Sequence, residues 1–263
     1  MQGQMYQYQE PAEIVNQELK IGALMLDSYN YQAGGPGNVS NNNTFYGLIG
    51  GLIQNGVKVD SIPGGDVPSE NNILGDYDII LVSYDLMKPT NTLINEKLAE
   101  YADNGGIVVY FGGSDGPYND IDFGWWKQEG FATPQDHLMQ EMGINVSGRT
   151  SGVTANSLTA QTGSIGEKVG DIDGYIQYMS LTGYSDVQNA TSIYKAGDTD
   201  IAFSVPVNNG RFYYFGFNPS YFTVKSTGEK LLNIVKAISE EHFEKGLQAQ
   251  TSISYKQIGR AHV

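Results

Sequence analysis

The sequence contains no cysteine and only three histidines among its 263 residues. Without cysteine the chain has no disulfide bond, no thiolate zinc site and no cysteine nucleophile. The histidines, His137, His242 and His262, are too few for a histidine-rich metal site. An oxygen-rich loop at 115–122 matches no EF-hand spacing, and its residues are common turn formers. The sequence therefore predicts neither a metal ion nor a cofactor.

Positive charge and long apolar runs are scarce as well. The chain has 15 Lys and Arg against 29 Asp and Glu, so its formal net charge is −14 and no basic face can neutralise the phosphates of a nucleic acid. No stretch approaches the ~20 apolar residues of a membrane-spanning helix, and the first residues lack the pattern of a signal peptide. The polar, aromatic composition, with 17% charged residues, favours an extracellular or cell-surface location and is typical of bacterial proteins that handle carbohydrate.

The two ends of the chain differ from the rest. Residues 1–19 are polar and irregular, which indicates an N-terminal arm or linker, and 245–263 resemble a truncated linker. The final residues, IGRAHV, resemble the translation of a common sequencing adapter. We interpret 258–263 as an artefact at the end of a metagenomic fragment, expect the gene to continue beyond it, and leave His262 out of every site.

Apolar runs and helix-spaced segments alternate between 20 and 144. Buried strands are predicted at 20–27, 57–62, 77–84 and 107–113. Helices are predicted at 44–56, 91–106 and 133–143. This alternation predicts βαβ units, so we expect a three-layer α/β domain with a mostly parallel sheet and helices on both faces.

The pattern changes in the second half of the chain. Residues 144–200 are rich in Ser, Thr and Gly, which predicts short strands and loops in a β-rich insertion or extension. Two apolar runs around Asn208-Asn209-Gly210 predict an antiparallel hairpin at 201–217. Helix spacing over 228–243 predicts a closing amphipathic helix, so the domain as a whole is expected to span 20–244.

Three sequence blocks carry a resemblance to a known family: DYDIILVSYDLMKP at 76–89, EKLAEYADNGGIVVYFGG at 96–113 and ATPQDHLMQEMGI at 132–144. They resemble the class I glutamine-amidotransferase-like domain of bacterial glycoside-hydrolase-type proteins, and are similar to the β-galactosidase trimerisation domain. The resemblance covers about 20–243. It implies a flavodoxin-like sheet and an accessory role beside a catalytic barrel, but no reaction.

The chain departs from that family where amidotransferases carry their chemistry. The resemblance implies a cysteine on the sharp turn after a central strand, where this chain has Gly-Gly-Ser-Asp-Gly at 112–116. The later His-x-Glu pair of the family has no clear match near 218–225. Both departures predict that the parent chemistry is lost.

The turn at 112–116 satisfies the G-x-S-x-G pattern directly after a predicted strand, which is the position of a nucleophile elbow. Ser114 is therefore a candidate nucleophile. Such a serine needs a histidine base held by an acid, and neither His137 nor His242 follows an acid in the expected order. The alternative is that the glycines only permit a tight turn.

Polar and aromatic residues follow the predicted strands at their carboxyl ends, where ligands bind in open parallel sheets. Alternatively, Asp27 and Asp85 cap the segments that follow them and Lys88 shapes its loop. Adjacent tryptophans cannot both point the same way on a regular element, so we expect one in the core and the other on a sugar or a partner surface. The candidate ligand-binding residues are Asp27, Tyr84, Asp85, Lys88, Ser114, Asp115, Tyr118, Asn119, Trp125 and Trp126.

These observations predict a non-catalytic accessory domain of a larger carbohydrate-active protein, acting in assembly or in shaping a carbohydrate site. Its expected partners are a neighbouring catalytic domain of the same longer chain or further copies of itself in a homo-oligomer, with carbohydrate as a candidate ligand. Two alternatives stay open. One is a serine-dependent hydrolase that uses Ser114, and the other is a domain that binds a sugar or small ligand without chemistry.

Overall fold

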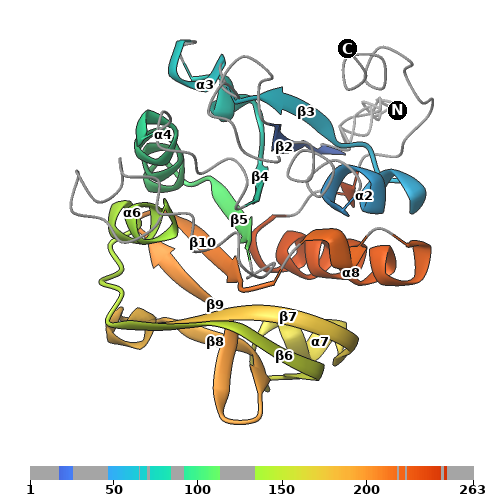
Figure 1. The fold of residues 1–263 in the computed structure, drawn as a ribbon. Coiled ribbons are helices and arrows are strands. Elements are labelled where there is room, and N and C mark those ends of the chain that lie inside the picture. Colours follow the sequence, from blue (N-terminus) through green and yellow to red (C-terminus); the bar gives the residue numbers. More distant parts are fainter. Residues whose placement is uncertain are drawn as a thin grey trace, which may run out of the picture.

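The computed structural model of the chain is built around a nine-stranded mixed sheet with helices on both faces (Figure 1). The predicted α/β class is therefore confirmed. The structure describes residues 18–25, 47–64, 66–69, 72–83, 92–112, 134–217, 219–222, 224–243 and 246–247.

Parallel strands form one half of the sheet. They are β2 (Ile21–Met25), β3 (Asp60–Pro63), β4 (Ile79–Ser83), β5 (Ile107–Phe111) and β10 (Gly210–Phe215). Their order is β3-β2-β4-β5-β10, which corresponds to the 2-1-3-4-5 order of flavodoxin-like sheets. Every residue of β5 is buried, as expected for a strand covered on both faces.

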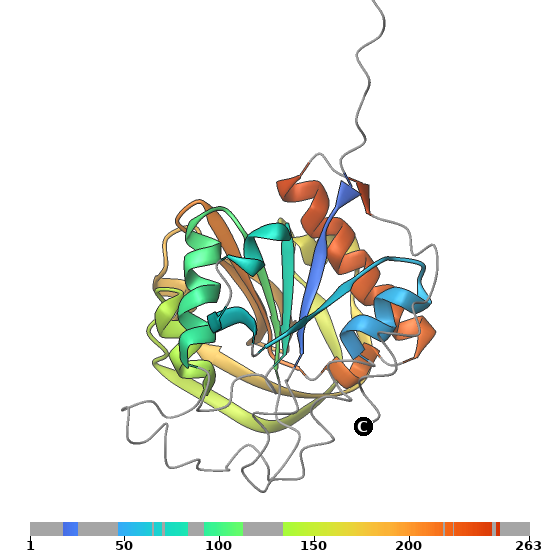
Figure 2. The same ribbon diagram turned by 90° about the horizontal axis from the view of Figure 1, so that it is seen from above.

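Helices cover both faces of this parallel half, which makes three layers. The helices α2 (Gly50–Gln54) and α8 (Lys225–His242) lie on one side, and α4 (Thr92–Asp103) and α6 (Pro134–Glu141) on the other (Figure 2). The short α3 (Asp66–Ser69) and the 3-10 helix η3 (Ile73–Asp76) connect β3 to β4. The predicted helices are confirmed, although α2 begins only at Gly50.

The strand predicted at 57–62 begins later than expected. The backbone N–H of Val57 donates to the carbonyl oxygen of Leu52 at 3.0 Å, so the chain is still closing the last turn of α2 at that point. The strand β3 consequently runs from Asp60 to Pro63 at the edge of the sheet. Proline suits this place, because an edge strand leaves some N–H groups without a ladder partner.

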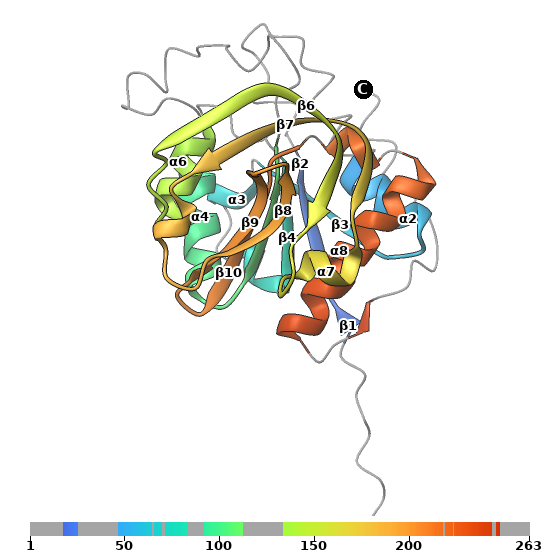
Figure 3. The same cartoon turned by 90° about the horizontal axis from the view of Figure 1, so that it is seen from below.

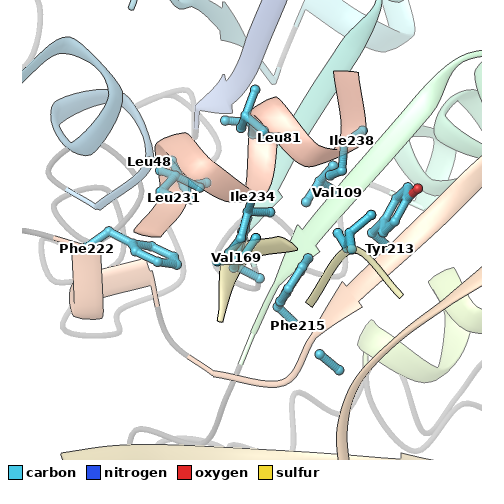
Figure 4. Packing of buried hydrophobic residues seen from close by; sticks show 14 of the residues in the cluster. Leu48, Leu81, Val109, Val169, Tyr213, Phe215, Phe222, Leu231, Ile234 and Ile238 are labelled. Atoms are coloured by element: carbon cyan, nitrogen blue, oxygen red, sulfur yellow. The ribbon is translucent and has the colours of Figure 1, made fainter. Parts of the chain in front are cut away.

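Successive residues of the central strands point alternately into two hydrophobic cores. Figure 4 shows one core, in which Val109 of β5 and Phe215 of β10 lie near Ile234 of α8. The other core contains Val108 of β5 and Leu98 of α4. Because both faces of β5 are covered with apolar side chains, its sequence reads as a continuous apolar run.

The second half of the sheet is antiparallel, which corrects the expectation of a mostly parallel sheet. Its strands are β9 (Thr199–Val207), β8 (Thr191–Ala196), β6 (Gly148–Ala160) and β7 (Ile172–Thr182), which follow β10 in that order. The hairpin predicted at 201–217 is confirmed as the antiparallel pair of β9 and β10. The segment 144–200 extends the same sheet, since β8 pairs with β9 and β6 pairs with β8.

The strands of this segment are long rather than short, with 13 residues in β6 and 11 in β7. Register shifts between Thr150 and Val153, and between Ala155 and Ser157, interrupt the pairing of β6 with β7. A bulge of this kind breaks the alternation of inward and outward residues, so the period that identifies a strand is lost. The Ser and Thr content then resembles that of a loop, although threonine favours strands.

The hairpin of β6 and β7 arches across one end of the molecule (Figure 3). An isolated antiparallel bridge joins Tyr178 of β7 to Phe217, which follows β10. The antiparallel half therefore curls back towards the strand from which it starts. The helix α7 (Ile165–Val169) fills the turn of the hairpin, and the hydroxyl group of Ser164 caps it by accepting from Gly166 N.

The first and last described strands lie side by side. The strand β1 (Glu18–Leu19) pairs in parallel with β11 (Gly246–Leu247) in a separate two-stranded sheet. Leu19 is buried in the core beneath α8. None of the helices in the described part of the chain combines the length and the hydropathy that a membrane crossing requires.

Candidate functional site

The predicted ligand site belongs to the carboxyl edge, by which we mean the edge of the sheet where β2, β4, β5 and β10 end. The ladders align these strand ends, since Ser83 pairs with Phe111 and Phe111 pairs with Phe215. All ten candidate ligand-binding residues, from Asp27 to Trp126, lie outside the described residues. Their role as ligands therefore stays a prediction, and the described residues define what lies next to them.

In the described part of the structure, aromatic rings pack together at the carboxyl edge. The ring of Phe111, the last residue of β5, stacks on that of Phe215 with 4.9 Å between the ring centroids. Phe222 contacts the same ring edge-on at 5.3 Å, from the 3-10 helix η8 (Pro219–Phe222). Edge-on and offset contacts of this kind each add about 0.5–1.5 kcal/mol beyond the buried area. This aromatic packing is therefore rigid and apolar.

The first glycine of the G-x-S-x-G turn is required by packing. Gly112 N donates to the carbonyl oxygen of Phe215 at 3.0 Å, which continues the ladder one residue beyond β5. A Cβ atom at Gly112 would lie 2.5 Å from the hydroxyl oxygen of Tyr110. This contact supports the interpretation in which the glycine serves the turn itself, independently of any catalysis by Ser114.

A tyrosine and the arching hairpin bound the carboxyl edge on the side of β10. The Tyr221 hydroxyl group donates to the carbonyl oxygen of Asp173 at 2.7 Å, which ties η8 to β7. Burial, and then the nearby charge of Asp173, raise the pKa of Tyr221 above its ordinary value. The hydroxyl group therefore stays protonated and acts as a structural donor.

The histidine side chain that the structure describes lies at the end of α8 opposite the carboxyl edge. His242 is the last residue of α8, which has 18 residues and so spans about 27 Å from the carboxyl edge towards the opposite end of the sheet. Its Nε2 atom forms a 2.6 Å hydrogen bond with the Tyr213 hydroxyl group. His242 therefore lies away from the carboxyl end of β5, the strand that Ser114 follows in the sequence.

The structure does not describe the side chains of the other two histidines. The backbone of His137 lies in α6, and the structure describes nothing of its side chain. His262 lies outside the described residues. Within the described ranges, no three His, Asp or Glu side chains gather as a metal site would require.

Sequence analysis did not identify a hollow at the opposite end of the sheet, the amino edge, where the parallel strands begin. A cleft of about 610 Å³ lies there, between η3, the second half of α4 and Phe243. We call it the amino-edge cleft. It is assembled from residues far apart in the sequence, such as Tyr77, Asn104 and Phe243. No motif links these residues, so no sequence signal could have indicated the cleft.

No protein-family model and no curated protein sequence matches the chain. Solved structures do match its fold. A β-galactosidase from Bacillus circulans sp. alkalophilus has a TM-score of 0.52 at 15% identity, over 90% of this chain and 32% of that one. A putative ThuA-like protein from Bacteroides uniformis has a TM-score of 0.55 at 11% identity, over 90% of this chain and 98% of that one. A cytoplasmic protein from Salmonella typhimurium LT2 has a TM-score of 0.52 at 13% identity, over 84% and 99%.

The chain spans about a third of the length of the β-galactosidases that it matches, with 31% and 32% coverage in two of them. At such low identity the likeness concerns the fold alone. The same fold accounts for part of a longer enzyme in one case and for nearly a whole protein in the others. The predicted likeness to a domain of β-galactosidases is thus confirmed at the level of the fold.

Proposed function

We propose that the chain is a non-catalytic, amidotransferase-like accessory domain of a larger carbohydrate-active protein of the glycoside-hydrolase type. In such a protein it acts in assembly or shapes a carbohydrate site beside a catalytic domain. The observation that carries the proposal is the coverage of the fold alignment, which takes in 90% of this chain but only 32% of the β-galactosidase from Bacillus circulans. A domain that forms one part of a longer enzyme would give this ratio.

The chemistry of the chain supports the absence of catalysis. The turn after β5 carries no cysteine, although the resemblance implies one in active amidotransferases. The glycine that opens this turn is needed for packing against Tyr110. His242 is engaged with Tyr213 at the far end of α8. A serine hydrolase would therefore need a base other than His242.

The sharpest test is to sequence the DNA on both sides of the region that encodes the chain. We expect an open reading frame that continues into a catalytic domain with the alternating strand and helix pattern of a barrel. A reading frame that ends close to the present termini would contradict the proposal. It would favour the separate-protein context of the ThuA-like neighbour, which the fold matches over 98% of its length.

The assembly role is tested on the chain itself. Trp125 and Trp126, outside the described residues, are the candidate contact residues, and if Trp126 makes the contact, Trp126→Ala should lower the mass measured by sedimentation or weaken sugar binding. Trp126→Phe is the matched control, because it keeps an aromatic ring of similar shape at the same position. Unchanged mass together with unchanged sugar binding in Trp126→Ala would count against a contact role for this residue.

A further inference from the structure

The amino-edge cleft has the size of a small-molecule site. Its volume of about 610 Å³ lies within the ~300–1,000 Å³ typical of ligand pockets. Its walls come from η3, from α4 and from the turn that precedes β5, and Phe243 closes one side. The cleft lies at the opposite end of the parallel strands from the predicted carboxyl-edge site. It is therefore a separate site, and one that the predicted ligand residues do not involve.

Aromatic side chains give the cleft a partly apolar wall. Tyr77 lines it and is half-buried. The backbone of Tyr77 is held from both sides, because its N–H donates to Leu74 O at 3.1 Å and its carbonyl oxygen accepts from the Tyr101 hydroxyl group at 3.0 Å. The Tyr101 ring is itself buried. The backbone position of Tyr77 beside the cleft is therefore fixed, which lowers the cost of ordering this residue against a ligand.

Polar groups around this wall are held in place by hydrogen bonds that leave them further capacity. Asn104 Nδ2 donates to Glu100 O at 2.8 Å, and the Lys97 ammonium group donates to a Glu100 carboxylate oxygen at 2.6 Å. On the other side, a carboxylate oxygen of Asp78 accepts from Lys20 N at 2.8 Å. An amide and an ammonium group each have more donors or acceptors than one such bond uses. The cleft thus offers both hydrogen-bond donors and acceptors.

The mixture of these groups selects among ligand classes. An anion would meet the carboxylates of Asp78 and Glu100, and the ammonium group of Lys97 is already paired. An apolar ligand would remove these polar groups from water without replacing their hydrogen bonds, which is costly. A ligand with several hydroxyl groups both donates and accepts, and its C–H face can lie against an aromatic ring. These requirements leave a neutral, hydroxyl-rich ring as the matching class.

We propose that the amino-edge cleft binds a neutral mono- or disaccharide, with Tyr77 as the stacking residue and Asn104 as a hydrogen-bonding residue. The choice of a sugar among hydroxylated ligands rests on the proposed function. The site itself goes beyond that function, because it lies away from the edge where an accessory role was predicted. It would let one domain hold sugar at one end of its sheet while the other end contacts a partner.

The test measures binding of galactose, glucose and lactose to the whole chain by saturation-transfer NMR and by titration. We expect at least one of them to bind with a Kd on the order of 1 mM. Tyr77→Leu should weaken that binding about tenfold or more, and Asn104→Leu about fivefold, which corresponds to one hydrogen bond. Glu96→Gln is the matched control and should change nothing, because Glu96 is exposed on α4 and does not line the cleft.

Asn104 is exposed, so its variant keeps the test valid even if Tyr77→Leu unfolds the chain. The proposal is overturned if no sugar saturates the chain below about 10 mM, or if Asn104→Leu leaves binding unchanged. Preferential saturation by spermidine or by inorganic phosphate would also overturn it, because the ligand class would be wrong.

Sugar binding that is lost in Trp126→Ala but kept in the cleft variants would support the proposed function and reject this site. Sugar binding in the cleft by a chain whose gene encodes no catalytic domain would instead support this site and contradict the proposed function.

Discussion

The parallel and antiparallel halves of the sheet differ in how they are buried. In the parallel half, β5 is buried along its whole length between two helical layers. In the antiparallel half, β6 leaves Thr154 and Asn156 exposed and buries Leu158. The antiparallel half contacts the end of β10 again through the bridge from Tyr178 to Phe217. The strand β10 joins the two regions, since it pairs in parallel with β5 and antiparallel with β9, and residues of β9 and β10 enter both cores. We infer that these shared strands make the two halves fold as one unit.

The largest expected effect comes from removing a ring where the halves meet. Phe215 in β10 is fully buried and stacks on Phe111, so Phe215→Ala should lower the free energy of unfolding by about 3–5 kcal/mol. Urea denaturation should still show one transition. Tyr175→Ala is the control, because Tyr175 is 70% exposed on β7 and its loss should cost within about 0.5 kcal/mol. Two separate transitions in the wild type would show that the halves unfold independently.

The next effect tests the start of β10, at the turn of the hairpin formed by β9 and β10. A Cβ atom at Gly210 would overlap the carbonyl oxygens of Ala102 and Gly106. Backbone atoms cannot move aside as a flexible side chain can, so Gly210→Ala should cost about 3 kcal/mol in urea denaturation. Gly197→Ala is the comparison, since that glycine has open space around it and only its φ of +58° is unfavourable for alanine. Its cost should be about 1 kcal/mol. Equal costs would mean that the turn at Gly210 can shift.

A smaller effect concerns pH at the end of α8. Burial lowers the pKa of His242, with Arg211 acting in the same direction, although the Glu241 carboxylate opposes the shift. A histidine with a lowered pKa binds protons more readily when unfolded. Its contribution to stability is therefore present above its unfolded pKa of about 6.5 and is lost as pH falls through the lower folded pKa. The drop in Tm between about pH 7.5 and pH 5 should be smaller in His242→Gln than in the wild type. A larger drop in the variant would reverse the sign and reject this account.

The smallest expected effect is none at all. A serine-reactive phosphonate should not label the wild-type chain, because the described histidine side chain is bonded to Tyr213 at the end of α8 opposite the carboxyl edge. Mass spectrometry of the intact chain gives the readout, and Ser114→Ala serves as the blank. Labelling of the wild type that is absent in Ser114→Ala would instead support the hydrolase alternative.

The parallel half could be predicted from the sequence because each of its strands carries its own signal. The run Ile107–Phe111 is apolar throughout, and Asn104-Gly105-Gly106 marks the end of the preceding helix. In the antiparallel half, bulges in β6 and β7 removed the alternation that identifies strands. The parallel share of the sheet was overestimated for the same reason, since strands that were not recognised could not be assigned a direction.

Only part of the candidate site could likewise be predicted from the sequence. Its location at the carboxyl edge follows from strand order, and the described strand ends at Ser83, Phe111 and Phe215 do lie in register. The roles of individual residues such as Ser114 depend on neighbours that no local pattern specifies. The amino-edge cleft was not predictable at all, because Tyr77 and Phe243 come together only through the packing of the whole fold.

The pairing of β1 with β11 has a consequence for engineering. Glu18 and Gly246 are ladder partners, so a short peptide could join the two ends of the described fold into a closed ring. New termini could then be opened at the exposed turn that contains Gly197 and Asp198, between β8 and β9, because exposed turns tolerate circular permutation. Such a permuted chain would carry its attachment points on the antiparallel half. A fused reporter or enzyme could thereby be attached at the turn between β8 and β9 instead of at the paired ends of β1 and β11.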